Sequence, residues 1–239
     1  MSGARFIVAP LPAVGEACLL SGAQAVHARA RRLSPGDPVV LVDGSGREAA
    51  AHVERAGRPS LRVRVASVSQ APPDPLPAIH LFVAAVRAER LSWIAEKATE
   101  LGAATLTLVV SARTQRQRAG ESLAPRLARV VEEAAKQSER AWWPRVAGPI
   151  GYAAALAGSA AGHRLLLDPR GDPFPSLLAP AETALLVGPE GGWSDAEHHS
   201  AIAAGWITAS LSAGKLRAET AAVAGLSLAR AALARGLAH

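Results

Sequence analysis

The residues best suited to chemistry lie within positions 184–219. An apolar run ending at Val187 precedes the loop 188–192, and a second, more polar loop covers 210–219. The first loop holds three glycines in five residues, which permit backbone angles closed to other residues and let a ligand approach the main chain. The carboxylate of Glu190 in that loop would repel a polyphosphate. The pattern therefore favours a ligand with hydroxyls or a cationic centre.

The two loops do not match the common nucleotide-binding motifs. This stretch has no Gly-x-Gly-x-x-Gly sequence, so the dinucleotide fingerprint is absent. Gly214-Lys215 resembles the end of a phosphate-binding loop, but that motif requires glycine and serine or threonine where this chain has Ala209 and Leu216. A ligand other than a nucleotide polyphosphate is therefore indicated.

Alternating elements must position these loops. Leu185 to Val187 is continuously apolar, which is typical of a strand buried on both faces. Ser194, with Glu197 three residues later, predicts a helix that begins with a capping box. A strand at 206–209 and an alanine-rich helix from 218 follow. Ligands bind beyond the carboxyl ends of strands in open α/β sheets, so both loops are expected at one site.

The chain from Ala78 to this stretch continues the same alternation. Apolar runs alternate with amphipathic stripes, which predicts a parallel sheet covered by helices. The expected elements are a strand at 79–86, a helix over 91–101, a strand at 106–110, a helix over 122–137 and a strand at 164–168.

The first 70 residues have a different pattern, with short strands and turn sequences that predict a small β-barrel. A short helix is expected over 23–33. The segment 70–77 has four prolines in eight residues and predicts an extended linker. We therefore expect two domains, 1–70 and 78–239. The strands expected in the first are 5–8, 39–42, 48–53 and 61–65.

Composition limits the partners and the compartment. The 239 residues include 26 Lys and Arg against 20 Asp and Glu, a formal net charge of +6. The excess is mostly arginine, which favours a nucleic-acid partner, although a GC-rich genome gives the same bias. The lone Cys18 rules out an internal disulfide and a cysteine-based metal site, and no metal is expected. Without a signal peptide or membrane-spanning run, we expect a soluble cytoplasmic protein.

Two motifs in sequence resemble those of a known family. Residues 186–194 (LVGPEGGWS) and 216–221 (LRAETA) are similar to the ribosomal RNA small subunit methyltransferase E family, which belongs to the SPOUT class. The resemblance implies an α/β fold: an N-terminal PUA-like β-barrel and a C-terminal SPOUT domain with a parallel sheet and a trefoil knot. It also implies a homodimer formed through the C-terminal domain. It extends over 5–6, 27–46, 87–102, 111–114 and 133–140.

The resemblance also implies a reaction, namely transfer of a methyl group from S-adenosylmethionine to uridine N3 in 16S small-subunit ribosomal RNA, within the assembled subunit. Because uridine N3 carries a proton at neutral pH, a base or a charge stabiliser is required, and the candidates are Arg217, Glu190 and Glu219. The cofactor-binding candidates are Leu167, Val187, Gly188, Gly192, Ser210, Leu211, Leu216 and Thr220. The RNA-binding candidates are Arg5, His27, Arg29, Arg32, Arg87, Arg90, Lys97, Arg113 and Arg140.

Alternatives stay open at this point. Arg217 and Glu219 could simply form an ion pair at the start of the last helix. The reaction could be ribose 2′-O-methylation by a SPOUT enzyme. The chain could also be an inactive RNA-binding assembly protein, because the loop 212–215 departs from the family pattern. His198 and His199 are poorly placed to share a metal, since adjacent helical residues point in different directions.

Overall fold

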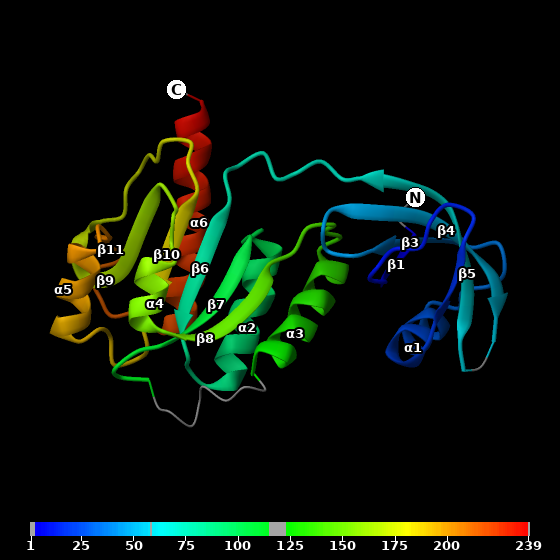
Figure 1. Ribbon diagram of the computed structural model, residues 1–239, viewed down its shortest axis with the longest axis horizontal. Coiled ribbons are helices and arrows are strands. Elements are labelled where there is room, and N and C mark those ends of the chain that lie inside the picture. Colours follow the sequence, from blue (N-terminus) through cyan, green and yellow to red (C-terminus); the bar gives the residue numbers. More distant parts are fainter. Residues whose placement is uncertain (1–2, 58, 115–122, 239) are drawn as a thin grey trace. The chain divides into compact units, whose positions relative to one another are not determined.

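The computed structural model describes residues 3–57, 59–114 and 123–238. The chain forms two compact units (Figure 1). The first comprises Met1–Pro73 with Ala135–Trp142, and the second comprises Asp74–Ala134 with Trp143–His239. The boundary at residue 73 falls in the proline-rich segment. The short segment 135–142, far from the N-terminus in sequence, belongs to the first unit.

The first unit is built on a five-stranded sheet in the order β1-β3-β4-β5-β2. β1 pairs with β3 in parallel, and the other neighbours are antiparallel. Alternate side chains such as Leu41, Val53 and Val63 are buried together with Phe6. The elements are β1 (Ala4–Ile7), β2 (Ala17–Leu20), α1 (Gly22–Ala30), β3 (Pro38–Val42), β4 (Arg47–Ala56) and β5 (Leu61–Gln70).

The segment 135–142 is anchored to the first unit through Trp142. The indole N–H of Trp142 donates to the carbonyl of Pro72 at 3.2 Å, and the Gly46 N–H donates to the carbonyl of Ala141 at 3.0 Å. Gly46 has φ 80°, and a Cβ on it would lie only 2.0 Å from the Trp142 ring. A residue larger than glycine would therefore displace the tryptophan.

The second unit contains a six-stranded sheet in the order β11-β9-β10-β6-β7-β8. Every neighbouring pair is parallel, which confirms the expected sheet type. The strands are β6 (Ile79–Ala84), β7 (Thr105–Val110), β8 (Arg145–Gly151), β9 (His163–Pro173), β10 (Thr183–Val187) and β11 (Ile207–Ser210).

Helices cover both faces of this sheet (Figure 1). One face packs against α2 (Ala88–Glu100), α3 (Leu123–Gln137) and α6 (Ala218–Leu237), and the other against α4 (Tyr152–Ala157) and α5 (Asp195–Ala203). Successive side chains of a strand point to opposite faces of the sheet, so each strand contributes side chains to both layers. In β6, Leu81 and Val83 face the first layer, whereas Phe82 and Ala84 face the second. The core therefore lies on both sides of the sheet.

Some elements were not anticipated. β2 is short and leaves Leu19 63% exposed, and β8 has no continuous apolar run, so neither shows a clear strand pattern. α4 was also missed. Ser122, the expected start of α3, lies outside the described residues. No helix in the described ranges is long and apolar enough to cross a membrane. The trefoil knot stays a prediction.

Candidate active site

A cavity of about 300 Å³ lies at the carboxyl ends of β9, β10 and β11. Open α/β sheets bind ligands at this position. Its walls come from a bulge in β9, the glycine loop 188–192, the loop after β11 and the start of α6. The lining residues are Arg113, Leu167, Asp168, Pro169, Arg170, Val187, Gly188, Pro189, Glu190, Gly191, Gly192, Trp193, Asp195, Ser210, Leu211, Ser212, Gly214, Lys215, Leu216, Ala218 and Ala221.

The bulge arises because the pairing of β9 with β11 changes register. Leu166 pairs with Thr208, but the next pair joins Asp172 to Ala209, so residues 167–171 bulge out of this pairing. A Cβ on Gly171 would lie 2.5 Å from the Thr208 backbone, so only glycine allows β11 to approach here. The bulge carries polar side chains from the sheet edge into the wall of the cavity.

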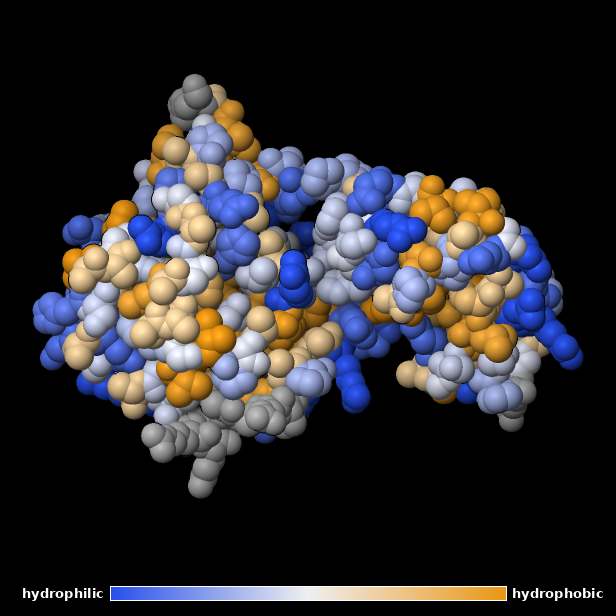
Figure 2. Space-filling model, in the orientation of Figure 1, coloured by the Kyte–Doolittle hydropathy of each residue, from blue (hydrophilic) through white to orange (hydrophobic). Residues whose placement is uncertain are grey.

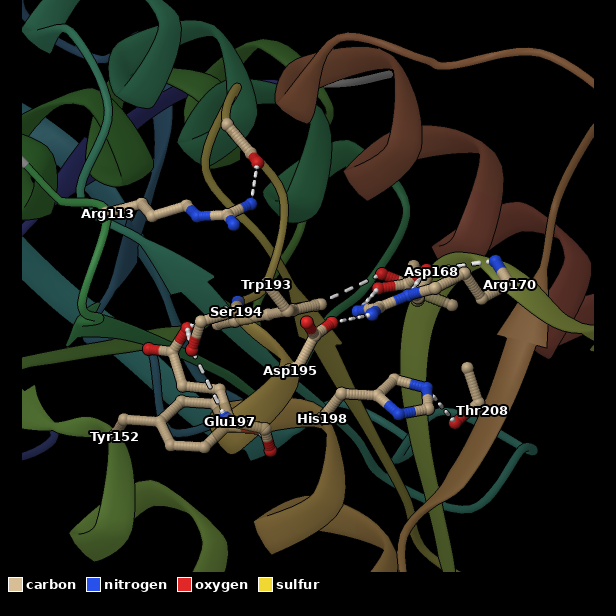
Figure 3. Close-up of polar contacts among 12 residues, drawn as sticks. Arg113, Tyr152, Asp168, Arg170, Trp193, Ser194, Asp195, Glu197, His198 and Thr208 are labelled. Atoms are coloured by element: carbon tan, nitrogen blue, oxygen red, sulfur yellow. Dashed lines mark hydrogen bonds and ion pairs between the residues drawn. The ribbon is translucent and has the colours of Figure 1, made fainter.

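Asp168 and Arg170 form a charged pair within this bulge (Figure 3). The Asp168 side chain is only 5% exposed, and Arg170 donates to both of its oxygens, with Nη2–Oδ2 at 2.8 Å and Nε–Oδ1 at 3.0 Å. Arg170 Nη1 also donates to Asp195 Oδ1 at 2.8 Å. Burial raises the pKa of Asp168, but the hydrogen bonds from Arg170 outweigh it, so the pKa lies below its ordinary value. Asp168 is therefore a carboxylate at neutral pH.

Trp193 packs against the glycine loop. Its side chain is 3% exposed, its ring lies 5.1 Å from that of Tyr152, and its Nε1–H donates to the Leu167 carbonyl at 3.2 Å. Burial raises the pKa of Tyr152, so its hydroxyl stays protonated and donates to the Glu197 carbonyl at 2.8 Å. Trp193 thus fixes the loop after β10 to the bulge of β9.

The start of α5 is fixed by the expected capping box, which the structure confirms (Figure 3). Ser194 Oγ accepts the Glu197 N–H at 3.2 Å, and Glu197 Oε2 accepts the Ser194 N–H at 2.9 Å. The other oxygen of Glu197 accepts the Ala112 N–H at 2.7 Å. Glu197 therefore joins α5 to the segment after β7, which carries Arg113 to the cavity.

The three catalytic candidates occupy different positions. Glu190 lines the cavity, whereas Arg217 and Glu219 do not. Arg217 is the exposed N-cap residue of α6 and lies between Leu216 and Ala218, which both line the cavity. The alternative ion pair between Arg217 and Glu219 is not formed. Glu219 Oε1 lies instead 3.7 Å from Arg90 Nε, and Arg90 Nη1 donates to Glu190 Oε1 at 2.8 Å.

Most of the cofactor-binding candidates come together around the cavity. Thr220 is the exception, because it is exposed on the first turn of α6 and does not line it. Pattern reasoning did not select the Asp168–Arg170–Asp195 cluster or Trp193 as site residues. Asp168 offered one signal, since it is a carboxylate at the end of an apolar run. The candidates that line the cavity are Leu167, Val187, Gly188, Gly192, Ser210, Leu211 and Leu216.

The RNA-binding candidates of the first unit lie on β1, on or just after α1, and in the segment 135–142. Arg5 forms an ion pair with Glu48 and, with His27, lines a second cavity of about 50 Å³. Arg29 and Arg32 are exposed on and just after α1, and Arg140 is partly buried in the segment 135–142. Hydrophilic side chains also gather over the outer ends of β4 and β5 (Figure 2).

Three RNA-binding candidates of the second unit, Arg87, Arg90 and Lys97, lie at α2, and Arg113 follows β7. Arg87 is the exposed N-cap residue of α2, and Lys97 is paired with Glu96 and Glu100. Arg113 is exposed, and its Nη1 donates to the Gly191 carbonyl at 2.5 Å (Figure 3). The structure therefore places Arg113 in the wall of the cavity as well as on the surface.

The lining fits S-adenosylmethionine. The volume of the cavity lies at the lower end of the range of about 300–1,000 Å³ for small-molecule sites. Apolar side chains such as Leu167 and Leu211 suit an aromatic base. The lining also holds three carboxylates (Asp168, Glu190, Asp195) and three basic side chains (Arg113, Arg170, Lys215), which suits a ligand that carries both a sulfonium cation and a carboxylate. No group of three or more His, Cys, Asp or Glu within the described ranges is arranged to hold a metal ion.

Comparison with known sequences identifies the family. The family model of an RNA methyltransferase domain matches residues 72–230, and that of an RNA methyltransferase PUA domain matches 20–66. The ribosomal RNA small subunit methyltransferase E of Synechocystis is 32% identical over 232 residues, 93% of this chain and 76% of the relative. Its counterpart from Mycobacterium tuberculosis is 34% identical over 233 residues, 92% of this chain and 88% of the relative.

Solved structures agree with this assignment. A ribosomal RNA small subunit methyltransferase E from Neisseria gonorrhoeae bound to S-adenosylmethionine is similar with a TM-score of 0.83 and 25% identity, covering 94% of this chain and 95% of that one. A Legionella pneumophila protein in complex with the same cofactor gives a TM-score of 0.86 and 26% identity, covering 97% and 98%. The chain therefore belongs to the ribosomal RNA small subunit methyltransferase E family of S-adenosylmethionine-dependent SPOUT methyltransferases.

Proposed function

We propose that the protein transfers the methyl group of S-adenosylmethionine to N3 of a uridine in 16S small-subunit ribosomal RNA. Membership of the family supports the cofactor and the class of RNA. The observation that carries the proposal for the base is the position of Arg217. Its side chain is exposed, belongs to no ion pair among the described residues, and lies between two cavity-lining neighbours. A cation is therefore available next to residues that line the cavity.

The chemistry of uridine N3 defines what these residues do. S-Adenosylmethionine, when bound, supplies a methyl group on a good leaving group, so the protein must align the acceptor and manage one proton. N3 loses its proton as it becomes nucleophilic, and the uracil ring then carries negative charge. Arg217 stabilises that charge. Glu190, which lines the cavity, is the candidate to orient the base or accept the proton, with Glu219 held behind it through Arg90.

The first unit is proposed to bind ribosomal RNA beside the target. The PUA match and the exposed Arg29 and Arg32 support this role, because arginines contact backbone phosphates well.

We also propose that residues 1–70 and 78–239 fold as separate domains. Limited proteolysis should then cut first within 70–78, and cutting elsewhere first would count against the division.

A homodimer through α6 completes the proposal. The helix carries many alanines, which allow close packing, and leaves Leu228 and Leu237 at 38% and 49% exposure. The second copy would cover these leucines.

Nucleoside analysis of a deletion strain tests the proposed reaction. Small-subunit ribosomal RNA from that strain should lack one 3-methyluridine that reappears when the gene is restored. Loss of a 2′-O-methyl nucleoside instead would assign the reaction to ribose.

A further inference from the structure

Arg90 connects three separate elements beside the cavity. It lies in the first turn of α2, whereas Glu190 lies in the glycine loop and Glu219 lies in the first turn of α6. Its Nη1 donates to Glu190 Oε1 at 2.8 Å, and its Nε lies 3.7 Å from Glu219 Oε1. The guanidinium therefore faces a carboxylate from each of the two sequence motifs that build the cavity.

Arg90 offsets the charge of both carboxylates, which water reaches only in part. The side chains of Arg90, Glu190 and Glu219 are 26%, 37% and 17% exposed. Glu219 Oε2 is buried and has no hydrogen-bond partner. A partly desolvated carboxylate is costly unless a cation lies close to it. Without Arg90, the two acidic side chains would turn toward water and draw the loop away from α6.

The glycine loop needs such an external restraint. Gly188 and Gly192 give its backbone wide freedom, and within the loop the Gly192 N–H donates to the Pro189 carbonyl at 2.8 Å. Arg90 holds the loop through Glu190, and Arg113 holds it through the Gly191 carbonyl. Each arginine comes from a different element, so the loop is fixed from outside at consecutive residues.

The backbone of Arg90 is held in place by the packing of α2. Leu91 and Ile94, which follow it on α2, are fully buried at 0% exposure in the core shared with α6. The Cα position of Arg90 is therefore determined by packing on the sheet, and its side chain transmits that position to the loop.

We propose that Arg90 is a positioning residue that holds the glycine loop against α6 and keeps the cofactor cavity formed before S-adenosylmethionine binds. Arg90 does not line the cavity, so it acts through Glu190. A preformed site costs less ordering on binding and therefore has a lower Kd. This role differs from the RNA contact that the family resemblance implied for Arg90, and it does not depend on which RNA atom is methylated.

Calorimetric titration of the full-length protein with S-adenosylmethionine tests the proposal. Arg90→Ala should raise the Kd about tenfold, and Arg90→Lys should recover part of the loss. The double variant Arg90→Ala/Glu190→Gln should bind no more weakly than the worse single variant, because both changes remove the same contact. Amide hydrogen exchange in 188–192 should become faster in Arg90→Ala.

The matched control is Arg230→Ala, which breaks an ion pair between α6 and Asp74 (2.9 Å) away from the cavity and should leave both readings unchanged. A wild-type Kd and unchanged loop exchange in Arg90→Ala would overturn the proposal. A loss of RNA affinity alone would do so too and would assign Arg90 to the RNA. Should Arg90→Ala fail to fold, Glu219→Gln decides instead, since Glu219 faces Arg90 without lining the cavity: a raised Kd supports the proposal and a wild-type Kd overturns it.

Discussion

Gly188 illustrates how a site depends on single atoms. A Cβ on this glycine would lie 3.0 Å from Cε2 and 3.1 Å from Nε1 of Trp193. The ring cannot easily retreat, because it is buried against Tyr152 and bonded to the Leu167 carbonyl. The need for glycine therefore comes from the tryptophan that supports the loop, in addition to the ligand that the sequence pattern suggested.

We predict that Gly188→Val displaces Trp193 and weakens cofactor binding at least tenfold, with a loss of stability of about 1–3 kcal/mol from overpacking. Calorimetric titration and urea unfolding measure the two effects. Gly151→Ala is the matched control, since a Cβ on Gly151 would meet nothing within 4 Å and Gly151 does not line the cavity. Equal affinity in Gly188→Val and wild type would show that Trp193 does not set the loop.

The pair of Asp168 and Arg170 predicts a pH dependence of stability. The pKa of Asp168 is lowered in the folded state, so the pair stabilises the protein above the unfolded pKa of about 3.9 and loses this effect as pH falls through the folded value. Arg170→Gln should therefore lower the Tm most near pH 7 and least near pH 2.

Asp195→Asn is the control for this prediction, because Asp195 is 86% exposed and its pairing with Arg170 is screened by water. It should change the Tm little at any pH. A Tm difference between wild type and Arg170→Gln that stays constant from pH 7 to pH 2 would contradict the assignment.

Sequence reasoning found the site residues that follow strands and missed those that meet through the fold. Val187, Gly188 and Leu211 could be placed because glycine and apolar patterns are local. The partnership of Arg90 with Glu190 spans 100 positions, and the Asp168–Arg170 pair depends on a bulge set by pairing with β11. Such contacts leave no periodic signal in the sequence.

At the scale of elements, the order from β10 to α6 was predictable because each segment carries its own start signal. The Ser194–Glu197 capping box began α5 as expected, and Leu185 to Val187 formed β10. β8 was not predictable because its partly exposed residues, with glycine and proline among them, show no period of two. α4 was not predictable because its six residues are too few to show a period of 3.6. Their positions follow from the tertiary packing of β8 beside β7.

We predict that Ser194→Ala costs about 1 kcal/mol, the usual value of an N-cap. Glu197→Ala should cost more, about 2–3 kcal/mol, because it also leaves the Ala112 N–H without its acceptor. Urea unfolding gives both free energies. Ser200→Ala is the control inside α5, where the hydroxyl only donates to the Ala196 carbonyl, and should be nearly neutral. Equal costs for Ser194→Ala and Glu197→Ala would show that the hydrogen bond from Ala112 to Glu197 does not stabilise the protein.

At the scale of the whole molecule, the proposed dimer gives the apolar part of α6 a partner. We predict a dimer by light scattering at micromolar concentration, and a monomer for Leu228→Glu, which buries a charge if α6 is the interface. Ser227→Glu, beside Leu228, is the control and should stay dimeric. Arg235→Ala is unsuitable as a control, because Arg235 donates to the Ser176 carbonyl. A monomeric wild-type protein would remove the dimer from the account.

Methylation of purified small ribosomal subunits with S-adenosylmethionine carrying a deuterated methyl group tests which atom of the RNA accepts the methyl group. Nuclease digestion and mass spectrometry then identify the labelled nucleoside. We expect labelled 3-methyluridine, formed slowly by Arg217→Ala although that variant binds the cofactor with unchanged Kd. A labelled 2′-O-methyl nucleoside, or no label from a protein that binds the cofactor, would contradict this expectation.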